Sequence, residues 1–82
     1  MSHQETTLDC LPPGAVASVV RVEGEDQIAR RLGDLGFWAG TLVEVVRRAP
    51  LGDPTQYGLR GYRLALRRVE ARRVVVRPGQ VP

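Results

Sequence analysis

Glycine and proline residues interrupt the chain at short intervals, so its regular elements must be short. Two of the uninterrupted runs, Ala15 to Val22 and Thr41 to Arg48, are rich in β-branched residues, which favour extended strands. Three shorter runs complete the pattern: Tyr57 to Arg60, Tyr62 to Arg67 and Arg73 to Arg77. We therefore expect about five short strands. Thr41 to Arg48 is apolar on both faces, which predicts that it lies in the centre of the sheet.

The segment between the first two strands has a helical pattern. Ile28, Leu32 and Leu35 recur at a spacing that places them on one face of a helix. Asp26 stands where a capping side chain is needed, and Gly36 stands where a left-handed residue commonly ends a helix. The sequence therefore predicts one helix between Asp26 and Gly36, inserted after the first strand.

The segment near residues 62–73 fits two structures. Tyr62, Leu64 and Leu66 alternate with other residues, which predicts a strand with these side chains inside, followed by a short turn over Arg68 to Arg72. A helix from Leu64 to Arg73 is the alternative, because the apolar residues of this segment also fit a helical spacing.

The 82 residues suffice for one domain. Short strands in an open sheet leave unpaired backbone groups at both edges, and closing the sheet into a barrel removes most of this exposure. We therefore predict a mainly β fold, a small SH3-like barrel over residues 8–78. Residues 1–7 and 79–82 are expected to be flexible tails.

The motifs of common enzyme classes are absent from the sequence. There is no glycine-rich phosphate loop, no CxxC and no HExxH, and the carboxylates are scattered singly over predicted turns. We therefore expect no enzymatic activity. The N-terminus lacks the apolar segment of a signal peptide, and no apolar run approaches the roughly 20 residues of a membrane span. This predicts a cytoplasmic protein.

Three side chains near the N-terminus form a weak metal-binding candidate. His3, Asp9 and Cys10 lie close together in the sequence, and this donor set suits zinc or ferrous iron. The alternative is a flexible tail next to a half-buried thiol. We expect no required cofactor, and a metal-bridged pair of two copies is a further alternative that one sequence leaves open.

The charge of the chain favours protein partners over nucleic acid. The net charge is only +3, and the few aromatic residues are not interleaved with the Arg residues as a single-strand platform requires. Arg63 and Arg67 alternate with apolar residues on a predicted strand. They belong to an Arg-rich outer face that is either a docking face for an acidic partner or for phosphates, or a solvated face that prevents edge pairing. The residues of this face are Arg60, Arg63, Arg67, Arg68, Arg72, Arg73 and Arg77.

One aromatic residue and one loop are candidates for contact with a partner. Phe37 is expected to be in the core, which leaves Trp38 exposed beside the Pro50 to Pro54 loop as a hydrophobic anchor. The alternative is that both rings cover the end of the barrel. The predicted contact residues are Trp38, Leu51, Gly52, Asp53, Pro54, Tyr62, Arg63 and Arg67.

Three stretches together resemble one family. LDCLPPGAVASVVRVEG (8–24), LGDLGFWAGTLVEVVRRAPLGDP (32–54) and RGYRLALRRVEARRVVV (60–76) are similar to the FeoA family of small accessory proteins of bacterial ferrous iron uptake. The resemblance implies an SH3-like barrel with a helix inserted after the first strand. It also implies association with FeoB, the permease that carries a cytoplasmic GTP-binding domain.

Two hypotheses of different classes follow from these observations. In the first, the chain is a cytoplasmic binding module that docks on the GTP-binding domain of the permease, and so comes to the inner membrane, and promotes Fe(II) transport. In the second, it is a metal-responsive module that binds Fe(II) or Zn(II) weakly. The resemblance favours the first and brings no catalytic residues with it.

Overall fold

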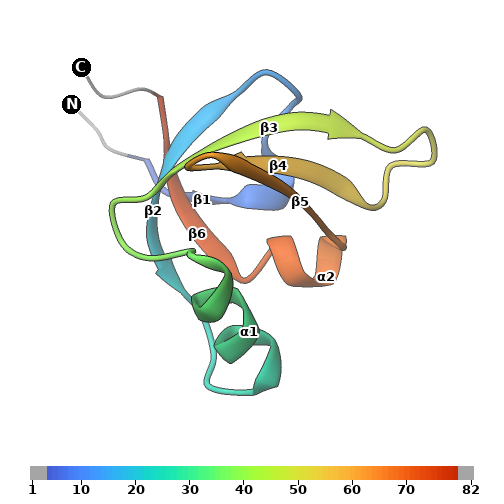
Figure 1. Ribbon diagram of the computed structural model, residues 1–82. Helices are drawn as coiled ribbons and strands as arrows, with labels where there is room; N and C mark the ends of the chain where they lie inside the picture. The colour runs from blue at the N-terminus through green and yellow to red at the C-terminus, as the bar shows by residue number, and fades with distance from the viewer. Residues whose placement is uncertain (1–3, 80–82) are drawn as a thin grey trace.

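The computed structural model describes residues 4–79, which form one antiparallel sheet with short helices around it (Figure 1). The strands lie in the order β1-β6-β2-β3-β4-β5. Within the described residues, no helix is long and apolar enough to cross a membrane. The elements are β1 (Thr6–Thr7), η1 (Leu8–Cys10), β2 (Val16–Val22), α1 (Gln27–Leu35), β3 (Leu42–Arg48), β4 (Thr55–Leu59), β5 (Tyr62–Leu66), α2 (Arg68–Ala71) and β6 (Val74–Pro78).

The sheet curls around one core, as expected for the predicted SH3-like barrel (Figure 1). Strand β3 is central, between β2 and β4, which confirms the prediction from its two apolar faces. The sheet has six strands, whereas about five were expected. The fully buried large side chains are Tyr57, Leu8, Leu32, Leu66, Val43, Val45, Val74 and Val76.

The additional strand is β1, in a segment that the sequence analysis assigned to a flexible tail. Thr6 pairs with Val76 and Thr7 pairs with Val75 of β6. Leu8, the next residue, is fully buried in the core. The ordered domain therefore begins before residue 8. The remaining parts of the predicted tails, residues 1–3 and 80–82, lie outside the described residues.

Helix α1 begins and ends as its sequence predicts. The Asp26 side chain accepts a hydrogen bond from the Ala29 N–H at 3.3 Å, which caps the first turn. At the other end Gly36 has φ 107°, and its N–H donates to the Gly33 carbonyl. The Phe37 N–H donates to the Leu32 carbonyl at 3.1 Å, and both side chains are buried. These two bonds define a Schellman motif, which favours glycine at the left-handed position.

Residues 62–66 are a strand and residues 68–71 are a single helical turn, so the alternative of one long helix is wrong. The prediction that alternate side chains of this strand point into the core is confirmed only in part. Leu66 is buried and Leu64 is half-buried, but Tyr62 is exposed. The reason is that Tyr62 lies at the first position of β5, beyond the barrel core, where its ring faces α1.

Candidate partner-binding surface

Trp38 and Tyr62 meet at the C-terminal end of α1. The Trp38 Nε1–H donates to the Gly33 carbonyl at 2.8 Å, and the Tyr62 hydroxyl donates to the Leu35 carbonyl. The last carbonyls of a helix have no partner within the helix, so these two side chains complete its termination. Trp38 is still 59% exposed and Tyr62 is 45% exposed. Both rings are therefore held in place and accessible at the same time.

A hollow of about 230 Å³ lies between these two rings. We name this region, with Trp38 and Tyr62 as its walls, the aromatic end of the barrel. Exposed Asp34 and Arg60 give its rim one charge of each sign. The hollow can accept an apolar side chain, because aromatic rings bury much area at little entropic cost. It is lined by Asp34, Leu35, Gly36, Trp38, Thr41, Leu59, Arg60 and Tyr62.

The predicted loop residues lie elsewhere. We name the segment Leu51 to Pro54 the loop end. It follows the last residue of β3, whereas Trp38 precedes the first, and a seven-residue strand extends about 20 Å. Figure 1 shows the β3–β4 loop on the side of the barrel away from α1. The expectation that Trp38 stands beside this loop is therefore wrong.

Backbone hydrogen bonds hold the loop end in a tight turn. The Gly52 N–H donates to the Ala49 carbonyl at 2.7 Å, and the Ala49 N–H donates to the Pro54 carbonyl at 3.0 Å. The Asp53 carboxylate accepts from the Arg68 N–H at 3.0 Å, which joins the loop to α2. Leu51 is 96% exposed at the tip. It therefore has little part in the packing of the domain.

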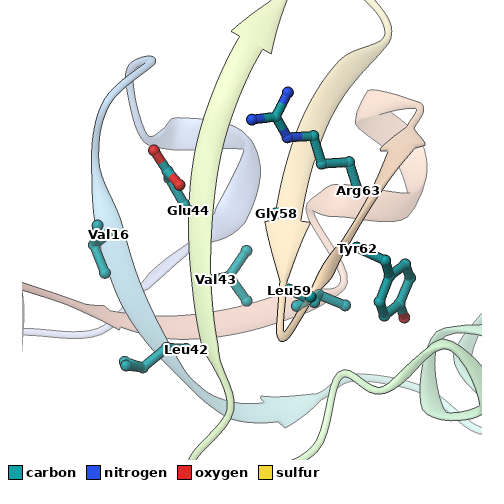
Figure 2. Close-up of a pocket in the computed structure, with 9 residues that line it drawn as sticks. Val16, Leu42, Val43, Glu44, Gly58, Leu59, Tyr62 and Arg63 are labelled. Atoms are coloured by element: carbon teal, nitrogen blue, oxygen red, sulfur yellow. The ribbon is translucent and has the colours of Figure 1, made fainter.

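The two predicted steering residues also lie apart. Arg67 precedes α2, where its backbone N–H donates to the Glu70 carboxylate at 2.9 Å, and its side chain is exposed. Arg63 lies on the outer face of the sheet, beside a second hollow of about 420 Å³ that sequence reasoning missed (Figure 2). Its lining residues come from β2, β3, β4, β5 and the turn between β4 and β5, and the strand register brings them together. They are Val16, Leu42, Val43, Glu44, Gly58, Leu59, Gly61, Tyr62 and Arg63.

Two of the three metal candidates are neighbours in η1. The Cys10 thiol lies 3.9 Å from the Asp9 carboxylate, which also accepts a hydrogen bond from the Thr7 hydroxyl at 2.5 Å. His3 lies outside the described residues. Within residues 4–79 there is no group of three or more His, Cys, Asp or Glu side chains that could hold a metal ion. Asp9 and Cys10 are therefore two neighbouring donor side chains, fewer than the three or four protein ligands of a typical zinc site.

The perturbed ionisable groups serve the fold. Arg73 donates to both carboxylate oxygens of Asp26, at 2.9 and 2.6 Å, and this bidentate contact with the Ala29 N–H holds the pKa of Asp26 well below its usual range. The same contact raises the pKa of Arg73. Burial raises the pKa of Tyr57, a core residue. Asp26 and Arg73 anchor α1 and Tyr57 fills the barrel, and none of the three lines either hollow.

Comparison with known proteins identifies relatives with this architecture. The FeoA of Stenotrophomonas maltophilia, solved with zinc and described as a prokaryotic SH3 domain protein, is 43% identical with a TM-score of 0.78. The match covers 87% of this chain and 88% of that one. The FeoA protein of Chlorobium tepidum is 40% identical with a TM-score of 0.81, and the match covers 89% of this chain and 70% of that one.

A curated relative links this domain to a transporter. The chain is 39% identical over 66 residues to the Fe(2+) transport protein A/Fe(2+) transporter FeoB fusion protein of Porphyromonas gingivalis. The match covers 80% of this chain but only 8% of the fusion protein. The family model of the FeoA domain matches residues 6–78, which includes the strand β1. The chain therefore belongs to the FeoA family.

Proposed function

We propose that this chain is a non-catalytic, cytoplasmic accessory protein of ferrous iron uptake. It docks on the GTP-binding part of a FeoB-type permease and promotes Fe(II) transport. The observation that carries the proposal is the relative in which a matching domain and the FeoB transporter form one chain. Fusion keeps two domains at a high effective concentration. In our proposal the domain contacts the transporter through a docking surface of its own.

The aromatic end is the main contact in this proposal. Trp38 and Tyr62 are exposed, yet hydrogen bonds to α1 fix both rings before a partner arrives. Side chains ordered in advance lose less entropy on binding, and aromatic residues carry much of the energy of protein interfaces. The loop end, with Leu51, Gly52, Asp53 and Pro54, is a second contact, and Arg67 steers an acidic partner toward it.

A titration of the permease's GTP-binding part into labelled protein tests the proposal, with and without nucleotide. Trp38→Ala and Tyr62→Ala are each expected to weaken binding about tenfold or more, as for residues at the centre of an interface. Val69→Ala is the matched control, because Val69 is an exposed apolar residue of α2 outside both ends. No binding by the unaltered chain in any nucleotide state would rule out the docking function.

A metal-responsive module is the second candidate, favoured by the zinc complex of the Stenotrophomonas maltophilia relative. In this chain Asp9 and Cys10 would supply two ligands and His3 a third, from one copy or from two copies joined by the metal. Calorimetry with Zn(II) and anaerobic Fe(II), beside sedimentation of the loaded protein, tests it. Cys10→Ser is expected to abolish binding, and equal heats for this variant and the parent would exclude these ligands.

A further inference from the structure

Four residues from four strands form one row on the outer face of the sheet. Val16 of β2 pairs with Glu44 of β3, Glu44 pairs with Gly58 of β4, and Gly58 pairs with Arg63 of β5. Residues paired across neighbouring strands point to the same face. The row therefore crosses the second hollow, with Gly58 as its floor and the two charged side chains on either side (Figure 2).

The glycine in this row is not required by the backbone. Unlike most glycines of the chain, Gly58 does not have a positive φ. A Cβ atom there would lie 3.5 Å from Val46 Cγ2 and 3.8 Å from Glu44 Oε1, which are ordinary contacts. Glycine within a strand weakens it, and often marks a place where another chain approaches closely. The missing side chain at Gly58 therefore opens the floor of the second hollow, which we name the groove over Gly58.

The two charges beside this floor are free to meet a ligand. Glu44 and Arg63 are exposed, and none of the ion pairs within residues 4–79 includes either of them. Figure 2 shows the Arg63 guanidinium reaching over β4 on the same side of the sheet as the Glu44 carboxylate. Leu42, which is 49% exposed, adds an apolar surface at one end of the groove.

We propose that this groove binds an extended segment of a protein partner. An apolar side chain of the segment sits over Gly58, an acidic group pairs with Arg63 and a basic group pairs with Glu44. Charge selects this occupant, because Glu44 repels a polyanion such as a nucleic acid or an anionic membrane, whereas a protein segment can present both signs. The inference deepens the proposed function and rests on it, since the segment belongs to the permease's GTP-binding part.

Gly58→Val tests the groove without damaging the fold. A β-branched side chain suits a strand and fills the floor, so the melting temperature is expected to equal or exceed that of the parent. The affinity for the permease's GTP-binding part is expected to fall about tenfold or more. Ala65→Val is the matched control, because Ala65 is exposed on β5, pairs with Gln56 in the neighbouring row and does not line this groove.

Charge reversal supplies an independent test that leaves the floor open. Arg63→Glu and Glu44→Arg are each expected to weaken binding about tenfold, and the loss should shrink at high salt. If Gly58→Val and both reversals bind like the parent, the groove is not the site, although the docking function stands. If the parent chain itself does not bind the permease part, the proposed function and this inference both fail.

Discussion

Strand β3 separates the aromatic end from the loop end. The sequence predicts both regions as contacts for a partner, but their structures differ. At the aromatic end, Trp38 and Tyr62 donate hydrogen bonds to the last turn of α1. At the loop end, Leu51 is 96% exposed, and the turn below it is held by backbone and Asp53 contacts. A change at the aromatic end should thus alter both the stability of the domain and its binding to a partner. A change of Leu51 should alter binding alone.

The largest contrast is expected between Trp38 of the aromatic end and its sequence neighbour Phe37 in the core. Phe37 is 2% exposed within the core, so Phe37→Ala should lower the free energy of unfolding by about 3–5 kcal/mol. Trp38→Ala removes one hydrogen bond and a partly exposed ring, and should cost about 1–2 kcal/mol. Urea unfolding of both variants measures the difference. Equal costs would show that Trp38 belongs to the core and is not a free anchor.

Two glycines at the C-terminal end of α1, Gly33 inside the helix and Gly36 just beyond it, should change stability with opposite signs. Gly36 has φ 107°, so Gly36→Ala is expected to destabilise the domain by about 1–2 kcal/mol through backbone strain. Gly33 lies within the helix, where a Cβ atom would meet nothing within 4 Å. Gly33→Ala should therefore stabilise the domain, by up to about 1 kcal/mol. A loss at both positions would mean that the aromatic end depends on more than the Schellman motif.

Removal of the Tyr62 hydroxyl should reduce stability less than Gly36→Ala does. Tyr62→Phe leaves the Leu35 carbonyl without its donor, but water can replace the hydroxyl at this exposed position. The expected cost is about 0.5–1 kcal/mol in urea unfolding. Binding to the permease part should persist, because the ring remains. A complete loss of binding would instead assign the contact to the hydroxyl group.

The predictable parts of this structure are those with local signals. Asp26 and Gly36 mark the ends of α1 because capping needs only neighbouring residues. Strand β1 was missed because Thr6 and Thr7 pair with β6 at the opposite end of the chain. The row through Gly58 depends on the register of four strands, β2, β3, β4 and β5, which no local pattern reveals.

The attachment of α1 should weaken in acid. Arg73 and the Ala29 N–H lower the pKa of Asp26 below its ordinary value of 3.8. A group with a lowered folded pKa contributes stability that is fully present above its unfolded value and is lost as the pH falls below it. Asp26→Asn should therefore destabilise the domain at pH 7 and have less effect below about pH 4.

Because Asp26 is half exposed, the destabilisation caused by Asp26→Asn should also shrink with added salt. Asp34→Asn is the control on the same helix, since Asp34 is exposed and takes part in none of the ion pairs within residues 4–79. Urea midpoints of the three proteins between pH 7 and pH 2 provide the measurement. A parallel pH dependence for Asp26→Asn and the parent would contradict the role of this carboxylate.

The smallest effect on stability is expected at the loop end. Leu51→Ser changes a side chain with almost no buried surface, so the free energy of unfolding should stay within about 0.5 kcal/mol of the parent. If the loop end is a contact, the same change should still weaken binding to the permease part, because a partner buries the leucine that the fold leaves exposed. A variant with parental stability and parental affinity would leave the aromatic end and the groove over Gly58 as the docking surface.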